Sequence, residues 1–234
     1  MNIWITGASR GIGAAIAKKL FLPDNKIILS ASNEDSFKDI RKTITDDYNI
    51  IFKKCDITKP DDITTSYSEI IKQVGNIDVL INNAGVANFK LVNDLSETEF
   101  DYMFNVNTKG IFLTIKAVLP EMLRAEKGII ININSVASLK TYTGSSVYSA
   151  SKAAALAISR TLREEVRQSG IKVIDIFPGA VNTDIWSDNA RKKHGDVMLI
   201  PEDVAEVVRE AIELSKNGRL MLEEIVLRPQ NGDL

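Results

Sequence analysis

The sequence predicts an α/β fold built on a doubly wound parallel sheet of about seven strands, with helices on both faces. Short apolar runs alternate with amphipathic stretches along the whole chain, as strands alternate with helices in such a fold. The apolar runs show no strict alternation with polar residues, which indicates strands that are covered on both faces of the sheet. We therefore expect ligands to bind beyond the carboxyl ends of the strands.

Each predicted element follows from its local pattern. Strands are expected at the apolar runs 3–5, 26–29, 50–53, 77–81, 128–134, 171–177 and 224–227. Helices are expected at the amphipathic stretches 14–22, 35–45, 60–74, 96–123 (in more than one piece), 147–168 and 201–216. Pro60 suits a first helical turn because its missing N–H is not needed there. Ser96 with Glu99 three residues later is typical of a capping box.

Composition narrows the class of protein. The 234 residues, 44% hydrophobic and 26% charged, fit one globular domain over 1–234, because no repeat or linker divides them. A net charge of -2 gives no reason to expect nucleic acid or a membrane surface as a partner. No run approaches the roughly 20 apolar residues of a membrane span. The single cysteine, Cys55, excludes an internal disulfide and suits a reducing compartment, so we expect a cytoplasmic protein and no metal site.

A glycine-rich turn follows the first predicted strand. Its spacing, G-x-x-x-G-x-G, differs from the commoner G-x-G-x-x-G fingerprint of dinucleotide-binding, Rossmann-type sheets. Glycines at such a turn let backbone N–H groups approach a pyrophosphate at a helix N-terminus. A turn without any ligand is the alternative. The residues that would meet a dinucleotide here are Gly7, Ser9, Arg10, Gly11, Ile12 and Gly13.

The same turn also fits G-x-S-x-G, the nucleophile elbow of serine hydrolases. That mechanism needs a histidine later in the chain, and the only one is His194, in a basic stretch that is typical of a mobile, solvated loop. An elbow on the first strand also leaves no earlier loop to donate the second oxyanion N–H. The sequence therefore disfavours a hydrolase.

Ser135 follows the fifth predicted strand, and Tyr148 and Lys152 stand four residues apart on the next helix. An i, i+4 pair shares one helix face, so the phenol and the ammonium can point the same way. A nearby ammonium favours the phenolate and lowers the pKa of a tyrosine from its usual ~10. Such a tyrosine can exchange a proton with a carbonyl or alcohol oxygen, and Ser135 can orient that oxygen. A lone Tyr-x-x-x-Lys pair would more simply be an ordinary surface pair.

Five segments together resemble the short-chain dehydrogenase/reductase family. They are Thr6-Gly7 with Gly11-Ile12-Gly13, Asn82-Asn83-Ala84-Gly85, Ser135, Tyr148-Ser149-Ala150-Ser151-Lys152 and Pro178-Gly179, in this order. The resemblance covers the chain from Asn2 to about Thr183, with a weaker tail.

The resemblance implies roles for the polar residues. Tyr148 would be the general acid and base, Lys152 would lower its pKa and hold the nicotinamide ribose, and Ser135 would orient the substrate carbonyl. A fourth catalytic residue, Asn107, would support a water-linked proton relay. The alternatives are that Asn105 holds that place, or that Asn107 only kinks its helix.

The resemblance also implies further cofactor contacts. Asp56 would bond the adenine amino group, with Ile57 beside it, although Asp56 is alternatively a simple loop carboxylate. The remaining implied contacts are Asn83, Ala84 and Gly85 near the adenine ribose, and Pro178, Gly179, Val181 and Thr183 near the nicotinamide.

The choice of nicotinamide depends on the residues after the second strand. NAD-preferring enzymes of this fold carry an acidic residue there, which bonds the ribose 2′-OH and repels a 2′-phosphate. Here Ala31 occupies that place, and Ser32 follows. Arg10 stands where many NADP-linked relatives carry the phosphate-binding base, and an arginine with a serine hydroxyl suits a phosphate. We expect NADP(H) rather than NAD(H), unless Arg10 is merely solvated.

Substrate choice is expected to lie in a lid at 184–199, which mixes apolar residues with basic ones; Trp186 could line the pocket or serve ordinary packing. The N-terminal three quarters is similar to bacterial 3-oxoacyl-(acyl carrier protein) reductases, but the tail 223–230 departs from them. We therefore expect a general carbonyl reductase acting on a small molecule. The acyl carrier protein reductase, and a non-catalytic dinucleotide sensor, stay as alternatives. The family commonly forms tetramers through two long helices, here expected at 107–123 and 147–168.

Overall fold

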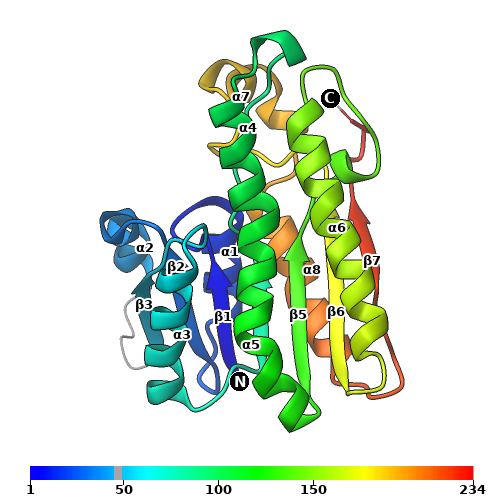
Figure 1. The fold of residues 1–234 in the computed structure, drawn as a ribbon. Coiled ribbons are helices and arrows are strands. Elements are labelled where there is room, and N and C mark those ends of the chain that lie inside the picture. Colours follow the sequence, from blue (N-terminus) through cyan, green and yellow to red (C-terminus); the bar gives the residue numbers. More distant parts are fainter. Residues whose placement is uncertain (45–48, 234) are drawn as a thin grey trace.

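The fold is a seven-stranded parallel sheet between two layers of helices (Figure 1), and it confirms the predicted class. The computed structural model describes residues 1–44 and 49–233. The strands lie in the order β3-β2-β1-β4-β5-β6-β7. Their bounds are β1 Asn2–Thr6, β2 Lys26–Ala31, β3 Ile50–Lys54, β4 Val79–Asn82, β5 Gly128–Ile133, β6 Ile171–Pro178 and β7 Glu224–Leu227. Because β1 and β4 are neighbours, the direction of winding reverses between them, which is where doubly wound sheets bind ligands.

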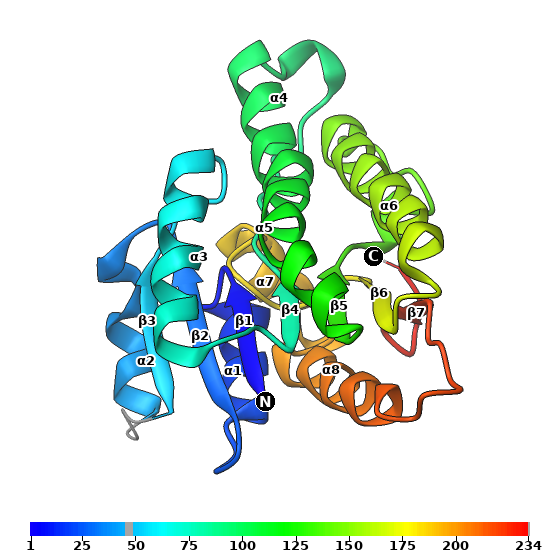
Figure 2. The same cartoon turned by 60° about the horizontal axis from the view of Figure 1, so that its bottom comes forward.

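The helices cover both faces of the sheet (Figure 2). Helices α3, α5 and α6 lie on one face, and α1 and α8 lie on the other. The helix bounds are α1 Gly11–Leu20, α2 Lys38–Thr43, α3 Pro60–Val74, α4 Glu97–Phe104, α5 Ile111–Ala125, α6 Ser146–Val166, α7 Asp188–His194 and α8 Pro201–Ser215. A π-helical segment, η3 (Asn105–Gly110), joins α4 to α5.

The two hydrophobic cores explain why the strands lack a polar face. In β1, Ile3 and Ile5 pack into the core beneath α1 and α8, whereas Trp4 between them packs into the core beneath α3, α5 and α6. All three side chains have no exposed surface. Since successive side chains of a strand point to opposite faces, a strand covered on both faces must be apolar throughout.

The predicted helix starts at Pro60 and Ser96 are confirmed. Pro60 occupies the first turn of α3. The Ser96 hydroxyl accepts a hydrogen bond from the Glu99 N–H at 3.2 Å, and the Glu99 carboxylate accepts one from the Ser96 N–H at 2.9 Å. These reciprocal bonds fix the start of α4.

Two stretches differ from the expectation. The helix expected over 35–45 is a 3-10 turn, η1 (Glu34–Phe37), followed by the short α2, and Thr45 lies outside the described residues. The mobile loop expected around His194 is wrong, because 188–194 form α7. Ser187 caps the start of α7. The basic residues of α7 lie in its last turn, where the helix dipole stabilises positive charge.

Among the described residues, no helix combines the length and the apolar character that crossing a membrane requires.

Candidate active site

The glycine turn between β1 and α1 packs its backbone closely against the backbone of the segment that follows β4. Gly7 has a φ of +62°, and a Cβ built on it would lie 2.7 Å from the Ala84 Cα. A Cβ on Gly13 would lie 2.5 Å from the Gly7 carbonyl oxygen. Real side chains do not tolerate such distances, so the close approach of these segments requires glycine at both positions.

Hydrogen bonds between Thr6 and Asn83 hold this turn in place. The Thr6 Oγ1 accepts bonds from the backbone N–H groups of Asn83 and Ala84, both at 3.1 Å. The Asn83 Nδ2 donates to the carbonyl oxygens of Thr6 at 3.1 Å and Gly7 at 2.9 Å. The glycine turn and the segment after β4, both predicted as cofactor contacts, are thus one bonded unit.

The N-terminus of α1 suits a bound anion. Its N-cap residue, Arg10, makes no side-chain capping bond, and the first turn carries no acidic residue. The N–H groups of that turn and the positive end of the helix dipole therefore face outward without a side-chain partner. Gly11 has a φ of +54°, and a Cβ there would lie 3.3 Å from Thr183, which places the nicotinamide-side segment beside the same turn.

The other predicted contacts around the turn are exposed to different degrees. Arg10 is solvent-exposed, and its guanidinium lies 3.9 Å from the Asp184 carboxylate at the start of the predicted lid. Ser32 is exposed just after β2, while Ala31 is buried at its end. Ile12 packs against the α1 side of the core. Ser9 is partly buried within the turn.

Ser135 and Tyr148 come together beyond the end of β5. Ser135 caps the 3-10 turn η4 (Val136–Ser138), with its Oγ accepting a bond from the Ala137 N–H at 3.1 Å. Tyr148 lies in the first turn of α6. Both side chains are 8% exposed. Burial raises the pKa of Tyr148, and the adjacent Ser135 hydroxyl acts in the opposite direction.

Lys152 is buried one turn further along α6. Its Nζ donates a hydrogen bond to the Ile133 carbonyl oxygen at 2.9 Å. Burial lowers its pKa to about 8, and the negative charge of Asp175 on β6 acts against that lowering. The expected lowering of the Tyr148 pKa by Lys152 stays a prediction; in the structure the largest influence on the Tyr148 pKa is burial, which raises it.

Asn107 lies in η3 and is completely buried. Its amide bonds both backbone groups of Val86, accepting from the N–H at 2.9 Å and donating to the carbonyl oxygen at 2.8 Å. It also donates to the Ser151 hydroxyl on α6 at 3.0 Å. A Cβ on Gly85 would lie 3.4 Å from the Asn107 Oδ1 and 3.5 Å from the Lys152 Nζ, so both polar groups converge on this glycine.

Asn105, the alternative position, is only half-buried and makes none of these bonds. The geometry therefore places Asn107, and not Asn105, beside Lys152.

Asp56 and Ile57 lie just beyond β3. The Asp56 carboxylate accepts bonds from the Thr58 N–H at 3.0 Å and from the Thr58 hydroxyl at 2.7 Å, so it orders its own loop. Ile57 is buried and packs against Gly110 at the end of η3. It therefore supports the segment that carries Asn107.

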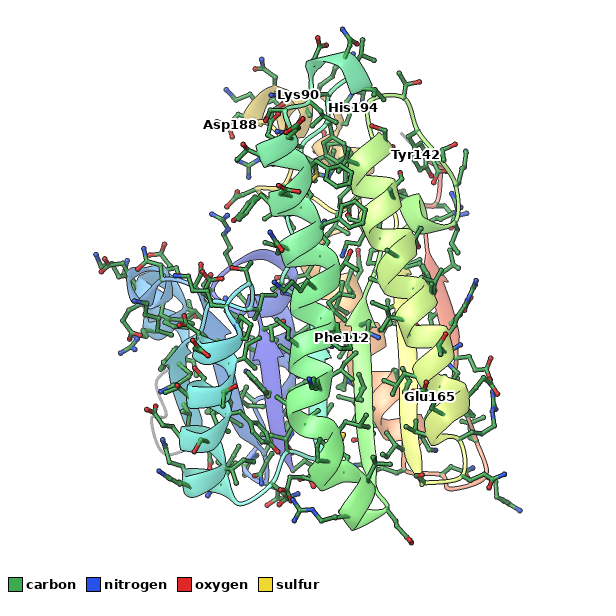
Figure 3. The ribbon with its side chains drawn as sticks, in the orientation of Figure 1. Lys90, Phe112, Tyr142, Glu165, Asp188 and His194 are labelled. Atoms are coloured by element: carbon green, nitrogen blue, oxygen red, sulfur yellow. The ribbon has the colours of Figure 1, made fainter. Side chains whose placement is uncertain are left out.

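The segment after β6 leads from the site into the predicted lid, which contains α7. Pro178 ends β6, and the Gly179 N–H donates to the Leu227 carbonyl oxygen at 2.7 Å. Val181 is buried and forms an isolated bridge with Leu199, which joins the segment before the predicted lid to the end of the lid. Within the lid, Arg191 pairs with Asp184 at 2.9 Å and with Asp188 at 2.6 Å. Figure 3 places Asp188 and His194 at this end of the molecule, with Lys90 and Tyr142.

Sequence reasoning missed three residues here, because none belongs to a recognisable motif. Phe89 packs edge-to-face on Tyr148, with ring centroids 5.6 Å apart. Asn134 accepts a bond from the Ser135 N–H at 3.0 Å. Asp233, near the C-terminus, accepts hydrogen bonds from the Tyr142 hydroxyl at 2.8 Å and from Lys140 at 3.1 Å, which ties the tail to the loop between Ser135 and Tyr148.

The site thus combines an anion cradle with a buried acid–base group. The start of α1 fits a dinucleotide pyrophosphate, since its first turn has no side-chain cap and no acidic residue, and its N–H groups suit an anion. Tyr148 offers a proton, and Ser135 can hydrogen-bond the same substrate oxygen. Within 1–44 and 49–233, no group of three or more histidine, cysteine or acidic side chains is arranged to hold a metal ion.

Comparisons with known proteins agree with this geometry. The sequence model of the family described as short chain dehydrogenase matches residues 1–194. A sepiapterin reductase of Chlorobaculum tepidum is 34% identical over 244 aligned positions, with 98% of this chain and 96% of that protein covered.

Solved structures show the same fold. A metagenomic short-chain oxidoreductase in complex with NADP is 30% identical, with a TM-score of 0.84 over 98% of this chain and 97% of that one. An alcohol dehydrogenase of the archaeon Thermococcus sibiricus, complexed with 5-hydroxy-NADP, is 28% identical, with a TM-score of 0.88 over 100% and 98% of the two chains.

Asn107 makes buried hydrogen bonds that Asn105 does not make, so replacing each residue by alanine should affect stability differently. We expect Asn107→Ala to lower the free energy of unfolding by about 2 kcal/mol, because it leaves the Val86 N–H without its partner. Asn105→Ala, the matched control in the same helix, should change it by less than about 0.5 kcal/mol. Urea unfolding followed by circular dichroism measures both. Equal losses in the two variants would contradict the assignment.

Proposed function

We propose that this chain, which belongs to the short-chain dehydrogenase family, is an NADP(H)-dependent oxidoreductase that interconverts a carbonyl and a secondary alcohol on a small molecule. The observation that carries the proposal is the convergence of Asn107 and Lys152 on Gly85, beside the Ser135–Tyr148 pair. These groups lie at the carboxyl ends of β4 and β5, next to the glycine turn, where the winding of the sheet reverses.

Each residue of the site then has a defined task. The reduced nicotinamide supplies the hydride to the carbonyl carbon when it is bound. Tyr148, whose usual pKa near ~10 keeps it protonated at neutral pH and whose pKa burial raises further, gives its proton to the oxygen that gains the negative charge. Ser135 orients that oxygen by a hydrogen bond. Lys152 and Asn107 support Tyr148 from the side of Gly85.

The choice of NADP(H) over NAD(H) is supported by the surroundings of β2. No acidic side chain stands at the end of this strand, where Ala31 is buried and Ser32 is exposed. Arg10 is exposed beside the start of α1, so its guanidinium is accessible to a 2′-phosphate. The metagenomic relative was solved with NADP and the archaeal one with 5-hydroxy-NADP, which agrees with this choice.

We propose the cytoplasm as the compartment. The one cysteine, Cys55, is buried, and burial raises the pKa of its thiol to about 11, so it stays protonated and unreactive.

We also propose a homo-oligomer formed through the outer face of α5 and α6. A groove between these helices is lined by apolar side chains, and Phe112 at its edge is 45% exposed, with Leu123 41% exposed. Figure 3 shows Phe112 and Glu165 on this pair of helices, away from Tyr142 and the catalytic end. A second copy of the chain would cover apolar surface that is otherwise in contact with water.

Tyr148→Phe tests the catalytic proposal. We expect turnover to fall by a factor of about 10² to 10⁴, because the proton donor is lost, while NADPH still binds. Turnover is measured as NADPH absorbance with a panel of carbonyl compounds that includes sepiapterin and a 3-oxoacyl thioester of acyl carrier protein. Binding is measured by calorimetry. A sensor, which lacks the chemistry, would show no turnover with the unchanged protein either.

Arg10→Ala tests the cofactor proposal. We expect the KM for NADPH to rise about tenfold, the effect of losing one hydrogen bond to a charged group, while the KM for NADH stays the same. Lys18→Ala, which removes an exposed cation at the far end of α1, is the control and should change neither value. An equal effect of Arg10→Ala on both cofactors would refute the assignment.

Phe112→Glu tests the oligomer. A charge within an apolar interface is costly to bury, so we expect the sedimenting species to shift from a dimer or tetramer to a monomer of 25.9 kDa. Phe100→Glu, on the exposed face of α4, is the control. A monomer already in the unchanged protein would remove the proposal.

A further inference from the structure

Three aromatic rings form a continuous surface that begins at the proposed proton donor. The Phe89 ring packs edge-to-face on Tyr148, with centroids 5.6 Å apart and planes at 69°. On its other side Phe89 stacks on Trp186, with centroids 5.0 Å apart and planes at 15°. We call Tyr148, Phe89 and Trp186 the aromatic wall. Its members come from α6, from the segment after β4 and from the predicted lid.

The exposure of Phe89 distinguishes the wall from ordinary core packing. Phe89 is 40% exposed and Trp186 is half-buried, whereas the large aromatics of the core, such as Trp4 and Phe37, are fully buried. An exposed phenyl ring leaves much of its apolar surface in water, which is unfavourable unless a partner covers it. The wall therefore offers flat apolar surface directly beside the reacting hydroxyl.

The position of Phe89 is held by its two neighbours. Asn88 and Lys90 both donate hydrogen bonds to the Oε1 of Glu99 on α4, that from Lys90 measuring 2.6 Å. The other oxygen of Glu99 accepts the capping bond from Ser96. One carboxylate thus anchors the segment on both sides of Phe89, so the ring is presented in a fixed place before any substrate arrives.

Tyr148 also packs within a cluster of apolar side chains. Its cluster contains Met103 and Ala137, with Val86, Ala87, Leu95, Tyr142 and Val147 packed against it. One basic residue of the lid, Arg191, is paired with Asp184 and Asp188, which balance its charge. This side of the site is therefore suited to an uncharged planar group rather than to a carboxylate or phosphate.

We propose that the wall binds the aryl group of the substrate, so that the enzyme acts on ketones and aldehydes whose carbonyl carbon carries an aromatic ring. The ring would lie against Phe89 and Trp186, with the carbonyl oxygen at the Tyr148 hydroxyl. Reduction of an aryl ketone consumes one NADPH and one proton and yields the benzylic alcohol and NADP⁺. The inference rests on the proposed function for its chemistry and on the wall for its substrate class.

A matched pair of ketones tests the proposal. Acetophenone and cyclohexyl methyl ketone share the reacting group and nearly the same size, but only the first carries an aromatic ring. Conjugation makes the acetophenone carbonyl less reactive, so each kcat/KM is divided by the rate at which borohydride reduces that ketone in solution. We expect the normalised kcat/KM to be about tenfold higher for acetophenone, as an aromatic contact of this kind gives. A ratio near one in the unchanged protein would overturn the proposal, because the wall would then act as plain apolar surface.

Phe89→Leu separates aromatic contact from bulk. It keeps an apolar side chain but removes the ring, so the ratio of the two kcat/KM values should fall toward one. Phe100→Leu is the matched control, because Phe100 is 44% exposed and also stacks on a second ring, Phe104 at 4.6 Å, but lies on α4. An unchanged ratio in Phe89→Leu, or an equal change in Phe100→Leu, would overturn the proposal.

Binding without turnover keeps this test independent of the proposed function. In Tyr148→Phe with NADP⁺ present, calorimetry should show acetophenone binding about tenfold more tightly than cyclohexyl methyl ketone, and Phe89→Leu in that background should abolish the difference. If no carbonyl compound is reduced by the unchanged protein, the proposed function fails while this binding result still decides the role of the wall. Equal binding of the two ketones would refute that role.

Discussion

The hydrogen bonds between Thr6 and Asn83 are the interaction on which the arrangement of the site depends. They join the ends of β1 and β4, the two strands between which the winding of the sheet reverses. With that junction closed, the glycine turn can touch Ala84, and the next residue, Gly85, comes to lie against Asn107 and Lys152. A side chain at Gly7 or Gly13 would push the glycine turn away from the segment after β4. The contact between these two segments therefore positions both the proposed dinucleotide site and Gly85.

A chain of buried hydrogen bonds then fixes α6 relative to the sheet. Thr114 on α5 donates to Asn82 at 2.7 Å, Asn82 to Asn132 at 2.9 Å, and Asn132 to Ser159 on α6 at 3.0 Å. Ser159 in turn donates to Asp175. Arg163, also on α6, donates to the same carboxylate at 2.9 Å.

Each donor in this chain has a defined acceptor, so sliding α6 along the sheet would leave several buried groups unpaired. Because Tyr148 and Lys152 lie on α6, this series of hydrogen bonds helps to set their distance from Ser135 and Gly85. The amphipathic pattern of 147–168 predicts the helix, but its position along the sheet depends on polar contacts such as these, which the pattern does not show.

Most of the fold could be predicted from the sequence, because two-sided burial makes the strands apolar and the helices amphipathic. What could not be predicted depends on tertiary context. The π-helical turns of η3 turn Asn107 inward and bring Gly110 against Ile57, and no local signal marks them. The basic residues 191–194 are typical of a solvated loop, yet pairing with Asp184 and capping by Ser187 make them a helix. Motif spacing identified Ser135, Tyr148 and Lys152, whereas Phe89 has no motif and is found only from its ring contacts.

The electrostatics of the site hold Tyr148 in the protonated form that reduction requires. Burial raises the pKa of Tyr148 and lowers that of Lys152 to about 8, so at neutral pH the phenol keeps its proton and the amine is still largely charged. Reduction needs a protonated donor, which Tyr148 already is; oxidation needs the phenolate, which burial disfavours. Asp175, held by Ser159 and Arg163 inside the sheet, sustains the ammonium form of Lys152 from below. The same buried network that positions α6 therefore also helps to maintain the charge beside which a substrate oxygen would accept its proton.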